Sequence, residues 1–279
     1  MNLDLPTGDS GRSALEVAEA AARAAGRVIL EGFHPQADGE RRAPEVSHKG
    51  RANIVTDTDR AAERESTAIL MEEFPRFNLL AEESGHTAGE GPYTWVVDPL
   101  DGTRNYASGV PHFAVNVALT HDGESVLGVT YDPVREEMFH AIAGQGAFMN
   151  GNPIAVSAID TLEMGVMGFD MGYTDDKAAR LLDALRGLWP GMQALRLMGS
   201  AALGMAYVAA GRIESYAHHN IEAWDIAPGL VLVREAGGVV TDVRNTTAVL
   251  NSPGIVAANP AFHKRFMEAT VDSEWRKQA

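Results

Sequence analysis

The pattern of apolar and polar positions divides the chain into a helical start, a run of short strands, and a second half in which strands and helices alternate. Apolar residues recur at helical spacing after Ser13-Ala-Leu-Glu16, which has the form of a capping box. This pattern predicts a helix from Ser13 to about Gly32 and, after a loop over residues 32–50, a second helix from near Asp57 or Asp59 to Glu73.

Short apolar segments bounded by turn residues follow the second helix and predict β-strands. Asp122-Gly123 is a typical hairpin turn, and the two segments that flank it form the clearest hairpin in the chain. The predicted strands of this half cover residues 78–81, 93–97, 113–120, 125–131 and 137–142. A run of consecutive strands favours an antiparallel sheet with its helices outside.

The second half alternates strands with helices, which favours an α/β arrangement. Strands are predicted over residues 165–169, 194–198, 213–217, 238–241 and 255–258, and helices over 175–188, 200–210, 225–236 and 261–276. The change of pattern predicts a boundary near residues 150–156. It separates an N-terminal α+β subdomain, residues 13–152, from a C-terminal α/β subdomain, residues 153–279.

Composition restricts the chemistry. The 279 residues contain 38 acidic and 23 basic side chains, a formal net charge of −15, and no cysteine. We therefore expect no direct contact with nucleic acid or an anionic membrane, and thiolate catalysis, disulfides and zinc–cysteine sites are excluded. The first dozen residues do not resemble a secretory signal, and no apolar window is long enough to span a bilayer, so a cytoplasmic protein is expected.

The strongest local signal is Trp95-Val-Val-Asp98-Pro-Leu-Asp101-Gly-Thr103, in which an apolar strand leads into two aspartates and a Gly-Thr pair. A turn after Asp98 can bring both carboxylates toward one point, with backbone N–H groups beside them. These groups would form oxygen ligands next to a small anion site. The alternative is an Asx-type turn in which the aspartates only cap backbone N–H groups.

Two further segments deliver acidic residues at the ends of elements. Glu82-Glu83 follows an apolar strand, and Asp225 begins an otherwise apolar helix. Taken alone, these positions are typical of a solvated pair and of a helix cap. Taken with Asp98 and Asp101, they supply the several carboxylates that a Mg²⁺ site needs.

These residues resemble the inositol monophosphatase family of Mg²⁺-dependent, lithium-sensitive phosphatases. The resemblance covers about residues 14–266 and includes three motifs in order: Ala81-Glu82-Glu83-Ser84, Asp98-Pro-Leu-Asp101-Gly-Thr103, and Trp224-Asp225-Ile-Ala-Pro-Gly229 followed by Glu235-Ala-Gly-Gly238. It implies a layered αβαβα fold with an antiparallel N-terminal sheet and a smaller mixed C-terminal sheet. It also implies a homodimer and a lithium-sensitive enzyme.

The resemblance also implies roles for individual residues. Two or three Mg²⁺ ions per subunit are expected; Glu82, Asp98 and the Leu100 carbonyl would hold the first, and Asp98, Asp101 and Asp225 the second. Glu82 and Thr103 would orient and deprotonate the attacking water. Asp59 would accept a hydrogen bond from the Thr103 hydroxyl, which would leave the hydroxyl oxygen as an acceptor for that water.

The residues expected to bind the substrate match the family's pattern less closely than the metal ligands do. By resemblance, the phosphate would rest on the amides of Gly102 and Thr103, and the expected substrate-binding residues are Asp101, Gly102, Thr103, Ala201, His218 and Asp225. Lys49 resembles a loop lysine of the family, and Arg104 adds a cation. His218 stands where inositol phosphatases carry a glutamate, and the alternative for His218-His219 is a surface turn.

Inositol 1-phosphate is the first expected substrate, hydrolysed in line by a metal-activated water. The alternatives are histidinol phosphate, suggested by the change at position 218, and another sugar phosphate or nucleotide handled by the family. A protein-binding regulatory module is the hypothesis from a different class. The complete set of carboxylates favours an enzyme.

Overall fold

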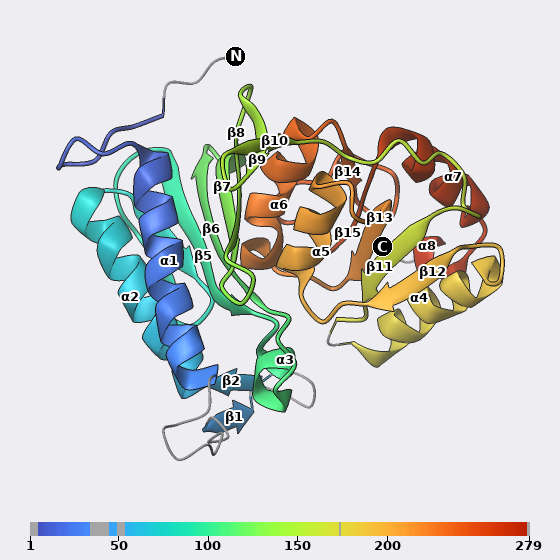
Figure 1. The fold of residues 1–279 in the computed structure, drawn as a ribbon, viewed down its shortest axis with the longest axis horizontal. Coiled ribbons are helices and arrows are strands. Elements are labelled where there is room, and N and C mark those ends of the chain that lie inside the picture. The colour runs from blue at the N-terminus through green and yellow to red at the C-terminus, as the bar shows by residue number, and fades with distance from the viewer. Residues whose placement is uncertain (1–4, 34–44, 49–53, 173, 278–279) are drawn as a thin grey trace.

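The protein forms five layers in which helices and sheets alternate (Figure 1). The computed structural model describes residues 5–33, 45–48, 54–172 and 174–277. In order, the layers are two helices, an eight-stranded sheet, two helices, a five-stranded sheet and an outer set of helices. This arrangement confirms the fold class that the sequence predicts.

The first layer consists of α1 (Ala14–Phe33) and α2 (Asp57–Glu73). The buried face of α1 is made mostly of alanine, so the helix can lie close to α2 and to the sheet. Thr56 caps α2 and shares a capping box with Asp59. This cap fixes Asp59 in the first turn of the helix, on the side that faces the site described below.

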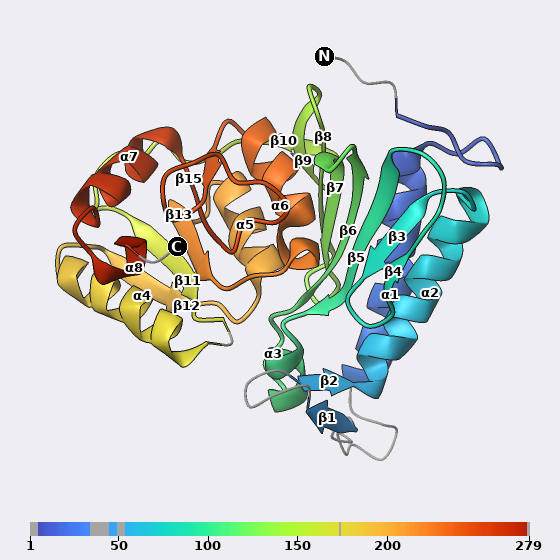
Figure 2. The ribbon, with the colours of Figure 1, turned by 180° about the vertical axis from the view of Figure 1, so that it is seen from behind.

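The first sheet has the strand order β10-β9-β8-β7-β6-β5-β3-β4 (Figure 2). All neighbouring strands are antiparallel except β3 and β5, which are parallel. The strands are β3 (Asn78–Ala81), β4 (Gly85–Thr87), β5 (Tyr93–Asp101), β6 (Ala114–His121), β7 (Glu124–Asp132), β8 (Glu137–Ile142), β9 (Gly146–Met149) and β10 (Asn152–Ile154). A separate pair, β1 (Val46–His48) and β2 (Ile54–Thr56), lies below them.

The middle layer consists of α5 (Ala201–Ala209) and α6 (Ala223–Glu235), which are apolar almost all round because a sheet lies on each side. Ala118, Gly128 and Ala141 are register partners on three adjacent strands and form a row of small side chains on the first sheet. A Cβ at Gly128 would lie 2.5 Å from the Pro228 carbonyl oxygen. Helix α6 therefore approaches the sheet as closely as it does because this position has no side chain.

The second sheet is mixed, with the order β12-β11-β13-β15-β14. Its strands are β11 (Val166–Asp170), β12 (Ala194–Leu197), β13 (Ser215–His219), β14 (Val239–Thr241) and β15 (Gly254–Ala258). β11 is parallel to β12 and β13, whereas β15 is antiparallel to β13 and β14. The outer layer contains α4 (Asp175–Leu188), α7 (Pro260–Ala269) and α8 (Glu274–Lys277).

Several predicted elements match and a few do not. The helix predicted over 261–276 is wrong as one element, because α7 ends at Ala269 and a turn through Thr270 and Ser273 precedes α8. The loop predicted over 32–50 contains β1, and its remaining part, beyond Phe33, lies largely outside the described residues. The predicted 152/153 boundary stays a prediction; β10, which begins there, pairs with β9 of the first sheet. Among the described residues, no helix is long and apolar enough to cross a membrane.

The contact at Gly128 gives a test of the middle layer. We expect Gly128→Ala to lower the free energy of unfolding by about 1–3 kcal/mol, because the added methyl group must push α6 from the sheet. Urea denaturation measures this change. Gly187→Ala is the matched control: its Cβ would meet nothing within 4 Å, and in helix α4 it should stabilise by about 0.5–1 kcal/mol. Equal effects of the two substitutions would contradict the packing argument.

Candidate active site

The predicted acidic residues meet at one edge of the first sheet. Because β3 and β5 are parallel, their carboxyl ends lie side by side, and Ala81 pairs with Val97. The backbone N–H of Glu82 donates to the Val97 carbonyl at 3.2 Å. Glu82 and Asp98 therefore leave the sheet at neighbouring points.

A β-bulge determines how Asp98 and Asp101 lie. On β6, their register partners Asn116 and Ala114 are two residues apart, whereas the aspartates are three apart, so β5 contains one extra residue. Residues three apart on a regular strand point to opposite faces, and the extra residue brings both carboxylates to the same face. Pro99, which has no N–H to contribute to the ladder, lies inside the bulge.

Both aspartates also accept backbone hydrogen bonds, as the Asx-turn alternative expects for Asp98. Asp98 Oδ1 accepts from the Leu100 N–H at 3.0 Å. Asp101 accepts instead from the first turn of α5: from the Ala201 and Ala202 N–H groups at 3.2 and 3.0 Å, and from the Ser200 hydroxyl. The capping contacts of Asp101 therefore join the first sheet to the middle layer.

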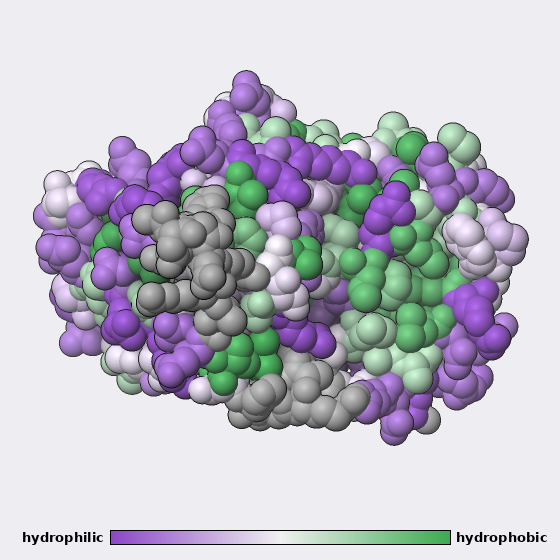
Figure 3. Space-filling view, turned by 60° about the horizontal axis from the view of Figure 1, so that its bottom comes forward, coloured by the Kyte–Doolittle hydropathy of each residue, from purple (hydrophilic) through white to green (hydrophobic). Residues whose placement is uncertain are grey.

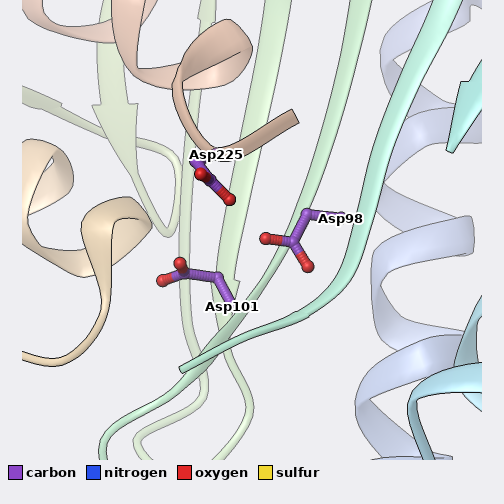
Figure 4. Close-up of side chains that lie close together, drawn as sticks. All are labelled: Asp98, Asp101 and Asp225. Atoms are coloured by element: carbon purple, nitrogen blue, oxygen red, sulfur yellow. The ribbon is translucent and has the colours of Figure 1, made fainter. Parts of the chain in front are cut away.

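Asp225 reaches the same place from the start of α6. Its Oδ2 accepts from the Glu222 N–H at 3.0 Å in a capping box, so it does cap its helix. Asp98, Asp101 and Asp225 each offer a carboxylate oxygen within 4.8 Å of the others, and the three side chains lie around a common space (Figure 4). Glu82 lines the same space.

The charges of this cluster indicate which kind of ligand it can hold. Burial and the negative charges of Glu82, Asp101 and Asp225 raise the pKa of Asp98 well above its ordinary value. Burial and the charge of Asp101 do the same for the pKa of Asp225, and burial raises the pKa of Asp101 to about 6. Converging oxygen ligands with excess negative charge fit a hard divalent cation, which would offset their repulsion.

Asp59 and Thr103 form a second pair behind the cluster. The Thr103 hydroxyl lies 2.9 Å from Asp59 Oδ1 and 3.0 Å from the Leu100 carbonyl oxygen, and its one proton can serve only one of them at a time. Asp59 is fully buried, and this burial raises its pKa to about 6 although hydrogen bonds from Thr56 and Thr103 lower it. The predicted contact between Asp59 and Thr103 is present.

Gly102 connects the bulge to the short helix α3 (Thr103–Ser108) with a φ of 95°, in the left-handed region that favours glycine. A Cβ there would lie 3.0 Å from the Gly199 carbonyl oxygen and 3.1 Å from that of His112. Glycine is thus required at position 102, because any side chain there would be strained between these two carbonyls.

A cleft of about 620 Å³, including its open mouth, gathers most of the predicted residues. Its walls include Glu82, Asp98, Leu100, Asp101, Gly102, Thr103, Arg104, Ala201, His218 and Asp225. Asp59 lies behind it, in contact with Thr103. Lys49 lies outside the described residues. The cleft also contains Asp170, Ser200 and the glycines at 172 and 199, which the sequence analysis did not select.

The surface turn considered for His218-His219 is wrong. Both residues belong to β13 and are buried, with exposed fractions of 8% and 4%. Strand alternation sends them to opposite faces: His218 lines the cleft, and the ring centroid of His219 lies 6.3 Å from that of Trp275. Burial lowers the pKa of His218 to about 3, so its ring is neutral at physiological pH.

Asp170 is the acidic cleft residue that sequence reasoning missed. It ends β11, and its register partner on β13 is His218. The available signal was an apolar strand that ends in a carboxylate, the same pattern as at Asp98. No motif accompanies it, and only the pairing of β11 with β13 places it beside the predicted residues.

The chain is similar to several known proteins. The model of the inositol monophosphatase family matches residues 11–277. The chain is 39% identical to an inositol-1-monophosphatase of Mesorhizobium japonicum, over 92% of this chain and 96% of that protein. It is 38% identical to the Nus factor SuhB of Pseudomonas aeruginosa, over 91% and 94%. The crystal structure of the extragenic suppressor protein SuhB from Bartonella henselae matches with a TM-score of 0.87 and 36% identity, covering 95% of this chain and 99% of that one.

The chain therefore belongs to the inositol monophosphatase family and is an inositol-monophosphatase-like phosphomonoester hydrolase. The family is Mg²⁺-dependent in general, and the cluster of Asp98, Asp101 and Asp225 could hold a metal ion.

The repulsion within the cluster predicts a stabilising substitution. A carboxylate whose pKa is raised by folding destabilises the folded state once the pH exceeds its unfolded value near 3.8. In chelator at pH 7.5, Asp98→Asn should therefore raise the melting temperature by a few degrees, and the gain should shrink as the pH falls toward 4. Mg²⁺ should raise the melting temperature of the wild type more than that of the variant.

Thermal unfolding followed by circular dichroism measures these shifts. Asp272→Asn, at an exposed position, is the control and should change little. A lower melting temperature for Asp98→Asn in chelator would show that the cluster does not store repulsion.

Proposed function

We propose that the protein is a Mg²⁺-dependent hydrolase of phosphate monoesters, with inositol 1-phosphate as its first substrate, giving inositol and phosphate. The observation that carries this proposal is the convergence of Asp98, Asp101 and Asp225 from separate elements within 4.8 Å, at the edge of a cleft. The matching relatives include proteins named inositol-1-monophosphatase.

The residues divide into two overlapping sets of metal ligands. Glu82, Asp98 and the Leu100 carbonyl would hold one Mg²⁺, and Asp98, Asp101 and Asp225 another; all five line the cleft. When bound, Mg²⁺ supplies Lewis acidity for the displacement and charge to hold the phosphate. Two ions add four positive charges to a chain with a net charge of −15, at the point where an anionic substrate must sit.

The chain itself orients the water. When the Thr103 hydroxyl donates its proton to Asp59, its oxygen remains free to accept a hydrogen bond. Thr103 and Glu82 both line the cleft. Donation to a carboxylate is stronger than donation to the competing Leu100 carbonyl, which favours this direction. Glu82 and Thr103 would then take hydrogen bonds from one water in line with the phosphorus, and Glu82 would accept its proton.

The remaining walls bind the substrate. The phosphate would lie over the amides of Gly102 and Thr103 beside Asp101 and Asp225, and the alcohol would extend toward Ala201 and His218. Histidinol phosphate is the alternative substrate, because His218 stands where the family has a glutamate. Other sugar phosphates and nucleotides are further alternative substrates. A protein-binding regulatory role is the remaining alternative, and its support is the set of relatives named Nus factor SuhB.

The deciding experiment is phosphate release from inositol 1-phosphate, histidinol phosphate and p-nitrophenyl phosphate, with Mg²⁺ and with chelator. We expect release that requires Mg²⁺ and that Asp98→Asn abolishes, because the shared ligand is lost. Asp59→Asn should lower kcat by about 10²-fold or more, since it removes the acceptor that directs the Thr103 proton. Asp272→Asn is the control. No release from any substrate, or release indifferent to chelator, would exclude the proposal.

We further propose that the protein is a homodimer. Exposed apolar side chains gather beside β12, the edge strand of the second sheet, and Figure 3 shows hydrophobic side chains over the side of the molecule that carries α4 and β12. Leu182, Trp189 and Leu197 are 42%, 52% and 59% exposed. An edge strand next to an apolar patch favours pairing with a second copy of the same surface.

Light scattering after gel filtration tests the dimer. The wild type should have twice the chain mass of 29.9 kDa, and Leu197→Glu should shift it to the monomer, because the charge would be buried at the proposed interface. Val271→Glu is the matched control, since Val271 is also 59% exposed but lies between α7 and α8. A monomeric wild type, or dissociation by both variants alike, would contradict this interface.

A further inference from the structure

Part of the cleft wall takes no part in holding the metal or the phosphate. Asp170 on β11 and His218 on β13 are register partners, both line the cleft, and each is 8% exposed. They come from the second sheet, whereas Glu82, Asp98 and Asp101 come from the first. These two residues are called the Asp170–His218 wall below.

The hydrogen bonds of Asp170 leave acceptor capacity. Its Oδ1 accepts from the Gly199 N–H at 2.6 Å and its Oδ2 from the Tyr216 hydroxyl at 2.8 Å. A carboxylate offers about four acceptor positions, so these two bonds fix its orientation and leave each oxygen able to accept another. The carboxylate is thus held rigidly at the cleft by two donors from the protein.

His218 is a second polar residue of this wall. Its Nδ1 is buried and has no hydrogen-bond partner in the part of the chain that the structure describes. Buried polar atoms are normally paired, so the protein itself does not complete the hydrogen bonding of this ring. The neutral ring can accept a hydrogen bond at one nitrogen and donate at the other.

The charge of the wall selects which part of the substrate can lie there. A phosphate is bound by positive charge and N–H donors, which the proposed Mg²⁺ ions and the Gly102 and Thr103 amides provide, so the alcohol is left to the side of Asp170. Hydrogen-bond donors on that alcohol, either hydroxyl or ammonium groups, are the complement of a carboxylate acceptor.

We propose that Asp170 extends the alcohol site at His218 as a specificity-determining residue, which accepts hydrogen bonds from hydroxyl or ammonium donors of the substrate's alcohol. The inference rests on the proposed phosphatase function and adds to it a carboxylate on β11, next to the strand position where the family has its glutamate. A substrate without such donors leaves the remaining acceptor positions of Asp170 without partners and is disfavoured.

Kinetics of Asp170→Asn test this subsite. The substrates are inositol 1-phosphate with hydroxyl donors, histidinol phosphate with an ammonium group, and p-nitrophenyl phosphate with neither. We expect kcat/KM for at least one donor-bearing substrate to fall about tenfold or more relative to that for p-nitrophenyl phosphate. A larger loss for histidinol phosphate identifies an ammonium donor, and a larger loss for inositol 1-phosphate identifies hydroxyls. Asp176→Asn, in the exposed first turn of α4, is the charge-matched control and should leave the ratios unchanged.

An equal loss on all three substrates would overturn the inference, because it would mean that Asp170 only positions Gly199 and the start of α5. If Asp170→Asn does not fold, His218→Phe tests the same wall with both bonds of Asp170 in place, and the same change in ratio is expected.

Calorimetry separates failure of the subsite from failure of the proposed function. If the wild type hydrolyses none of the three substrates, titration with free inositol and free histidinol still reports on the wall. Binding of either alcohol that Asp170→Asn weakens about tenfold supports the subsite. Absence of binding to the wild type, or equal binding to both proteins, overturns it.

Discussion

Repulsion among buried carboxylates is the interaction on which the site depends. Asp98, Asp101 and Asp225 approach each other in surroundings that penalise their charge, and each is held there by backbone N–H donors from Leu100, Ala201 and Glu222 respectively. These donors compensate only part of the repulsion, since the pKa values of all three groups stay raised. This repulsion raises the free energy of the folded protein without the metal. A bound divalent cation would remove the repulsion, and the free energy released would contribute to its affinity.

The helices behind the cluster are closely packed and hold the carboxylates in place against this repulsion. Helix α6 delivers Asp225 and rests directly on the first sheet at Gly128, while α5 delivers the N–H groups that hold Asp101. The middle helices therefore act on both sheets at once. A shift of α6 would move Asp225, and a shift of α5 would move the N–H groups that hold Asp101. The active site therefore depends on how both sheets pack against the middle helices.

Local patterns predicted the elements whose signals are local. The helix over 175–188 and the strands over 78–81 and 137–142 have the predicted bounds, because periodicity, caps and turn residues lie within each segment. The convergence of Asp98 and Asp101 was expected from a turn, and the structure achieves it with a bulge whose extra residue is visible only against β6. Asp170 and the burial of His218 could not be predicted, because both depend on which distant strand pairs with which. The break between α7 and α8 likewise depends on Trp275, a fully buried anchor with no local signal.

The bulge in β5 determines which face of the sheet Asp101 occupies relative to Asp98. On a regular ladder, the same spacing of three residues would turn Asp101 to the opposite face of the sheet, away from the cleft and from the start of α5. The two residues between the aspartates thus contribute through their number as well as their chemistry. Over evolution, we expect this segment to tolerate changes of side chain at Leu100, which offers a backbone carbonyl, far more readily than changes that remove the bulge.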